Sequence, residues 1–156
     1  MALKMNAAEL KAFLLLEFPQ VADEFEITDL STERLDVALR VQDKHLRPGG
    51  TVSGPSMFAL ADVAAYLHIL ALIGPRALAV TTNCGIDFMR KPSAGADLLC
   101  KNEVVKLGRS LAVCQSMIYS ADQTQPVARA NLTYAIPRDG CGEWQAGRWG
   151  NIIPYF

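Results

Sequence analysis

The sequence predicts an α+β fold in which an antiparallel sheet of five or six strands wraps one long apolar helix. Residues 53–75 form an apolar run with helix signals at both ends. Four strand-like runs follow it, over 77–90, 97–107, 109–121 and 126–136. The turns between these runs are short, which favours an antiparallel meander. Because the helix is apolar on nearly every side, other structure must surround it.

The central helix has clear predicted boundaries. Ser53 or Gly54 suits the N-cap, and Pro55 suits the first helical position. Gly74 and Pro75 form a stop signal after about five turns.

The remaining segments complete a single predicted domain over residues 1–156. Residues 6–18 have apolar side chains at helical spacing and precede a proline, which predicts an N-terminal helix. Residues 25–28 and 34–41 alternate polar and apolar side chains, as two antiparallel strands do. Residues 138–156 form an aromatic tail, rich in Gly and Trp, to which no role is assigned.

Composition limits the possible partners. The chain has 156 residues, of which 51% are hydrophobic and 20% charged, so it is expected to fold as one soluble domain. The net charge of −1 provides no positive field for nucleic acid or anionic lipid. The long apolar run carries Asp62 and His68, which argues against a membrane span.

No two of the four cysteines have the Cys-x-x-Cys spacing. Cys84, Cys100 and Cys114 lie in strand-like runs, where cysteine usually behaves as a small buried apolar residue. This usage predicts a reducing, cytoplasmic location.

Asp62 is the anomalous residue of the central helix, because a carboxylate is costly to bury among apolar side chains. It could lie on an exposed stripe or cap a neighbouring backbone amide. Alternatively, it could act as a catalytic acid, base or nucleophile. The start of the same helix, with its free amides near Ser53 and Gly54, could hold an oxyanion or could simply be a capped end.

Gly54 and Asp62 cannot serve one substrate atom within a single chain. Eight residues of helix separate them by about 12 Å, whereas reacting groups must approach to about 3–3.5 Å. If both act together, a second subunit supplies one of them, which predicts a homodimer or a larger homo-oligomer with a shared site.

The two histidines offer little support for a metal site. His68 lies about 240° around the helix from Asp62 and is predicted to be a packed core residue. His45, in the polar loop before the helix, is predicted to be solvated.

The segment from Ser53 to Ala64 matches the pattern His-Gly-Gly-x-x-x-x-Leu-x-Asp-x-Ala, and the segments 80–92, 103–113 and 127–137 extend the match. On these motifs the chain resembles the hotdog-fold thioesterases, specifically the PaaI-type branch of the 4-hydroxybenzoyl-CoA thioesterase superfamily. The resemblance implies a hotdog fold with active sites formed between two subunits.

The resemblance also implies roles for individual residues. Asp62 corresponds to the acid that attacks the thioester carbonyl or activates water, and Gly54 to the residue whose amide polarises that carbonyl. Thr81 corresponds to a Ser or Thr that helps position the water. Ser53 replaces the family's His, and Pro55 replaces its second Gly. Pro55 has no N–H, so an oxyanion hole here depends on Gly54.

Four cations at predicted strand ends or turns are candidates for holding the phosphates of CoA: Arg90, Lys91, Lys106 and Arg109. An arginine, Arg47, occupies the place where the family's preceding loop often has Asn or Gln. Each of these cations could equally be part of an ordinary solvated surface.

The sequence therefore predicts an acyl-CoA thioesterase that needs no metal or redox cofactor, with CoA as part of the substrate. The apolar side chains of Met57, Phe58 and Tyr66 suggest an aryl or medium-chain acyl group. One alternative is a protein that binds acyl-CoA or acyl carrier protein without turnover. Another is a hotdog dehydratase or hydratase that uses His45.

Overall fold

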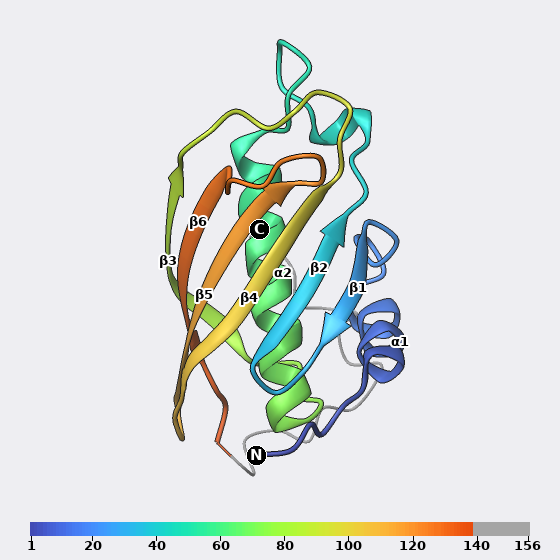
Figure 1. The fold of residues 1–156 in the computed structure, drawn as a ribbon. Helices are drawn as coiled ribbons and strands as arrows, with labels where there is room; N and C mark the ends of the chain where they lie inside the picture. Colours follow the sequence, from blue (N-terminus) through green and yellow to red (C-terminus); the bar gives the residue numbers. More distant parts are fainter. Residues whose placement is uncertain (139–156) are drawn as a thin grey trace, which may run out of the picture.

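The computed structural model describes residues 1–138 and confirms the α+β prediction. A single six-stranded antiparallel sheet, in the order β1-β2-β4-β5-β6-β3, curves around the helix α2 (Figure 1). The elements are α1 (Ala7–Glu17), β1 (Phe25–Leu30), β2 (Arg34–Leu39), the 3₁₀ turn η1 (Asp43–His45), α2 (Gly54–Ile73), β3 (Val80–Phe88), β4 (Leu98–Leu107), β5 (Leu111–Ser120) and β6 (Ala128–Ala135). This is the hotdog arrangement.

The order of the strands corrects one prediction. The last four strands do not form a continuous meander, because β3 pairs with β6 rather than with β4. The segment 89–97 separates β3 from β4 and is long enough to cross the end of the sheet (Figure 1). As a result β3 lies at one edge of the sheet and β1 at the other.

Local signals set the boundaries of α2 as predicted. Ser53 has extended backbone angles (φ −72°, ψ 154°), and its hydroxyl accepts the N–H of Ser56 at 3.3 Å. Gly74 ends the helix with φ of +94°, a conformation that side chains other than glycine rarely adopt. Most of the helix between these ends is buried against the sheet.

The N-terminal helix also lies where it was predicted. Asn6 and Glu9 form a reciprocal capping box at its start, with N–H···O distances of 2.8 and 2.9 Å. α1 packs beside β1, so this edge of the sheet has a helix next to it (Figure 1).

Composition alone makes α2 long and apolar enough to cross a membrane. Two thirds of its most apolar window is nevertheless buried inside the protein, mainly against strands β2, β4 and β5. Its apolar character is therefore that of a core helix.

The histidine predictions had different outcomes. His68 is fully buried, as predicted, and its Nδ1 lies 3.0 Å from Nδ2 of the buried Asn102. The prediction for His45 was wrong, because only 6% of this residue is exposed. Its Nδ1 accepts the N–H of Gln42, and its Nε2 lies 2.9 Å from a carboxylate oxygen of Glu24. These partners satisfy the polar atoms of the ring and allow its burial.

The cysteines of the described chain follow their predicted role in part. Cys100 and Cys114 are buried, and burial raises the pKa of each thiol to about 12. Cys84 is only half-buried. Cys141 and the rest of the predicted aromatic tail from 139 onward lie outside the described residues.

Candidate active site

Asp62 lies on the half-buried side of α2 that faces β3 and β6. Its Oδ1 accepts the hydroxyl of Thr81 at 2.5 Å and the hydroxyl of Tyr134 at 2.6 Å. The carboxylate therefore contacts side-chain donors from two strands distant in sequence, and no described backbone amide donates to it.

A β-bulge aims Thr81 at this carboxylate. Thr81 pairs with Tyr134 and Asn83 pairs with Thr133, so Thr82 is an extra residue in β3. In a regular strand, the alternation of side chains would place Thr81, three residues before Cys84, on the face opposite to Cys84. The bulge at Thr82 brings Thr81 onto the same face as Cys84, where it reaches Asp62.

Tyr134 was missed by the sequence analysis. It is 2% exposed, its ring stacks on Tyr66 at 6.3 Å, and it is the strand partner of Thr81. Alternation along β6 could have placed Tyr134 on the buried face. Its position beside Asp62 depends on the β3–β6 pairing, which the expected meander did not contain.

The first turn of α2 presents one free amide. Gly54 is the first helical residue, so its N–H has no acceptor within the helix. Pro55 has no N–H, and Ser56 donates its N–H to Ser53. The Ser53 hydroxyl donates to Ser56 Oγ at 2.9 Å, so this side chain is engaged in the cap.

Phe88, at the end of β3, covers the helix start. A Cβ added to Gly54 would lie 3.1 Å from the tip of the Phe88 ring. Gly54 thus allows a close approach between the helix and the exposed edge strand, while Phe88 itself remains 53% exposed.

A cavity of about 620 Å³ opens beside Gly54. It combines apolar side chains with three cations, and its lining consists of Arg47, Pro48, Thr51, Val52, Gly54, Met57, Phe88, Met89, Arg90, Lys91 and Pro92. Arg90 donates to the carbonyl of Pro126 at 3.0 Å. This volume and lining suit a ligand with an apolar body and an anionic group.

The structure does not bring all the predicted site residues together in one chain. Asp62 and Thr81 are not part of the cavity beside Gly54. Lys106 and Arg109 lie at the β4–β5 turn, near the Val80 end of the sheet, whereas Arg90 follows the Phe88 end of β3. Of the three predicted apolar residues, only Met57 lines the cavity. Tyr66 instead donates its hydroxyl to the carbonyl of Ala77.

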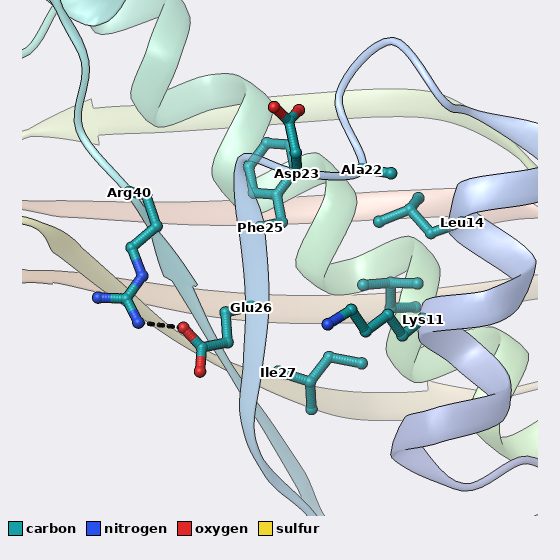
Figure 2. Close-up of a pocket in the computed structure, with 9 residues that line it drawn as sticks. Lys11, Leu14, Ala22, Asp23, Phe25, Glu26, Ile27 and Arg40 are labelled. Atoms are coloured by element: carbon teal, nitrogen blue, oxygen red, sulfur yellow. Dashed lines mark hydrogen bonds and ion pairs between the residues drawn. The ribbon is translucent and has the colours of Figure 1, made fainter.

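A second cavity, of about 310 Å³, lies between α1 and β1 and is separate from these groups (Figure 2). Apolar side chains such as Leu14 and Phe25 line its interior. Lys11, Asp23 and the ion pair of Arg40 with Glu26 add two positive and two negative charges. This balance favours no class of charged ligand.

Within residues 1–138, no three His, Cys, Asp or Glu side chains gather as a metal site would require.

Comparison with known proteins identifies the family to which the chain belongs. The model of the thioesterase superfamily matches residues 49–127, about half of the chain, and includes both Gly54 and Asp62. The chain belongs to this superfamily, which confirms the resemblance inferred from its motifs.

Three solved structures illustrate the relationship. A candidate thioesterase from Silicibacter sp. TM1040 is 52% identical, with a TM-score of 0.83 over 88% of this chain and 95% of that one. A mutant of the phenylacetic acid degradation protein PaaI from Thermus thermophilus is 28% identical, with a TM-score of 0.65 over 76% and 99%. A Streptococcus mutans protein bound to acetyl-CoA is 25% identical, with a TM-score of 0.64 over 73% and 89%.

Proposed function

We propose that the protein hydrolyses acyl-CoA thioesters at a site shared between two subunits. The observation that carries the proposal is the placement of two reactive groups at opposite ends of one edge strand. Thr81 near the start of β3 contacts Asp62, and Phe88 at its end covers Gly54. An exposed strand edge can pair with a second copy of itself.

The proposed shared site requires one specific pairing of two β3 strands, with a two-fold axis at Gly85. In the β3–β6 ladder, Thr81, Asn83 and Cys84 occupy the three positions before Gly85, and Ile86, Asp87 and Phe88 occupy the three positions after it. An antiparallel pair of β3 strands with a two-fold axis at Gly85 therefore places Thr81 opposite Phe88 of the partner subunit. The carboxylate of one protomer then faces the helix start of the other.

In the proposed reaction, the Gly54 N–H of one protomer donates to the thioester carbonyl oxygen. Asp62 of the other takes a proton from water as the water oxygen bonds to the carbonyl carbon, or it attacks that carbon directly. The C–S bond breaks, and CoA leaves as a thiolate that takes up a proton. A covalent acyl-Asp62 intermediate, where it forms, is hydrolysed by water.

The cavity beside Gly54 supports an assignment of substrate class. Its apolar side chains, among them Met57 and Phe88, suit an aryl or medium-chain acyl group or the pantetheine arm. Arg47, Arg90 and Lys91 suit the phosphates of CoA.

A panel of acyl-CoA substrates with a thiol reagent tests the proposal. We expect thiol release with aryl or medium-chain substrates and a loss of about 10³-fold in the Asp62→Asn variant. Release that is unaffected by this substitution would contradict the role of Asp62. Binding without turnover would identify the non-catalytic alternative, and a change at the enoyl-thioester absorbance band would identify a dehydratase.

Disulfide trapping tests the shared site directly. No described atom lies within 4 Å of a Cβ added at Gly85, so a cysteine fits there. Opposed Cα atoms in an antiparallel pair are about 4.5–5.5 Å apart, within the range of a disulfide. We expect Gly85→Cys to form a dimer on non-reducing gels, while Thr28→Cys on the opposite edge strand does not.

A further inference from the structure

Two hydroxyl groups converge on a single oxygen of Asp62. Thr81 lies 2.5 Å from Oδ1, and Tyr134 lies 2.6 Å from the same atom. Each hydroxyl has one proton to donate, and an ionised carboxylate only accepts. Two converging donors fix the orientation of the carboxylate.

The proton of Tyr134 is available to the side chain of Asp62. The Tyr134 hydroxyl also lies 2.8 Å from the backbone carbonyl of Asp62, but this carbonyl has the N–H of Tyr66, four residues later in α2, as its helical donor. Burial, and then the negative charge of Asp62, raise the pKa of the Tyr134 hydroxyl. Tyr134 therefore keeps its proton near neutral pH.

The second oxygen, Oδ2, is left free. No described residue donates to it, and it is not among the buried atoms that lack a partner, so it is not fully buried. The donors thus distinguish the two oxygens of the carboxylate. One accepts donors from two strands of the sheet, and the other has no described donor.

We infer that Tyr134 is a positioning residue that acts with Thr81 to hold Oδ1 and so makes Oδ2 the reacting oxygen. This inference rests on the proposed function for its kinetic consequence. The hydrogen bond itself can be tested without turnover. The other titratable group facing Asp62 is Cys84 on β3, whose thiol pKa is raised by burial and by the charge of Asp62.

Kinetics distinguish positioning from packing. Tyr134→Phe retains the ring that stacks on Tyr66 and removes only the hydroxyl. We expect kcat to fall about 10- to 100-fold with KM unchanged. In the Asp62→Asn background the same substitution should have no further effect. Thr81→Val should act like Tyr134→Phe, and Thr81→Ser should retain activity.

Carboxyl ¹³C NMR provides the test that does not require activity. With Asp62→Asn used to assign the signal, we expect the ¹³C chemical shift of the Asp62 carboxyl, measured at one fixed neutral pH, to change in Tyr134→Phe because a hydrogen bond to Oδ1 is lost. Tyr66→Phe is the matched control, because its hydroxyl donates to the carbonyl of Ala77, and it should leave the Asp62 chemical shift unchanged.

The outcomes separate the two proposals. An unchanged Asp62 carboxyl chemical shift in Tyr134→Phe overturns the role of Tyr134, whether or not the enzyme is active. The role of Tyr134 is also overturned if Tyr134→Phe lowers kcat further in a protein that already carries Asp62→Asn. A changed Asp62 chemical shift in a protein that hydrolyses no thioester retains the hydrogen-bond assignment and rejects the proposed function.

Discussion

The two halves of the candidate site are built in different ways. The amide half, at Gly54, is formed by consecutive residues, with Ser53 as the cap and Pro55 beside it. The carboxylate half joins Asp62 of α2, Thr81 of β3 and Tyr134 of β6. The first half is a fixed dipole that does not titrate, whereas the second depends on protonation and on three elements meeting. The protein therefore combines one locally formed group with one that only the complete fold can assemble.

The largest effect expected in the amide half comes from Gly54→Pro. Proline suits the first helical position, and Ser53 already has the extended angles that a following proline requires. The helix should therefore form while the single free N–H is lost. We expect kcat to fall about 10²–10³-fold in a thioesterase assay.

Gly54→Ala is the matched control for that substitution. It adds the same Cβ near Phe88 but keeps the N–H, so most of the activity should remain. If the two variants lost activity equally, contact with Phe88 and not the amide would be the cause.

A smaller effect is expected from the cations beside the amide half. Under the proposed function, Arg47→Ala and Lys91→Ala should each raise KM for acyl-CoA about fivefold with kcat unchanged, because each would remove a proposed contact to a phosphate of CoA. This increase in KM should be smaller at high salt, because salt screens the attraction between the cations and the phosphates. If KM in both variants equals that of the unmodified protein, Arg47 and Lys91 do not bind CoA, and their assignment is wrong.

Lys106 and Arg109 lie at the other end of the sheet and can be compared with the cations that line the cavity beside Gly54. We expect a smaller rise in KM for Lys106→Ala and Arg109→Ala, since neither residue lines the cavity beside Gly54. An equal rise would indicate that cations from the two ends meet in the assembled protein.

The smallest predicted effect concerns the stability contributed by Glu24, which contacts His45 next to the start of α2. His45 accepts the N–H of Ser53 on its carbonyl at 2.8 Å, and its ring contacts Glu24. Burial opposes ionisation of Glu24, but hydrogen bonds from Lys44 and His45 outweigh it and hold the pKa of this carboxyl below its ordinary value. A lowered pKa gives stability that is present above the unfolded value and lost as pH falls through the folded value.

Glu24→Gln should therefore reduce the free energy of unfolding by about 1–2 kcal/mol at pH 7. The difference in the free energy of unfolding between Glu24→Gln and the unmodified protein should become smaller below about pH 4.5, the ordinary pKa of this carboxyl. Thermal denaturation across pH measures it, with the exposed Glu26→Gln as the control. A difference that stays constant down to about pH 3 would contradict the assignment.

The difference between the locally formed amide half and the carboxylate half, which three elements assemble, explains what could be predicted from the sequence. Ser53, Gly54, Pro55 and the stop at Gly74 act through neighbours in the chain, so the boundaries of α2 were predictable. The environment of Asp62 was not, because the contact with Tyr134 requires the β3–β6 pairing and a bulge at Thr82. The burial of His45 depended on Glu24, 21 residues away, for which no local pattern gave a signal.

Mixing two inactive variants measures the central claim of a shared site most directly. Gly54→Pro and Asp62→Asn chains are coexpressed or refolded together at equal amounts, with each variant alone as a reference. In a shared site, half of the dimers pair unlike chains and hold one intact site of two, so activity should return to about a quarter of that of the unmodified protein. Activity no higher than the mean of the two variants alone would show that each site lies within one chain and would contradict the account.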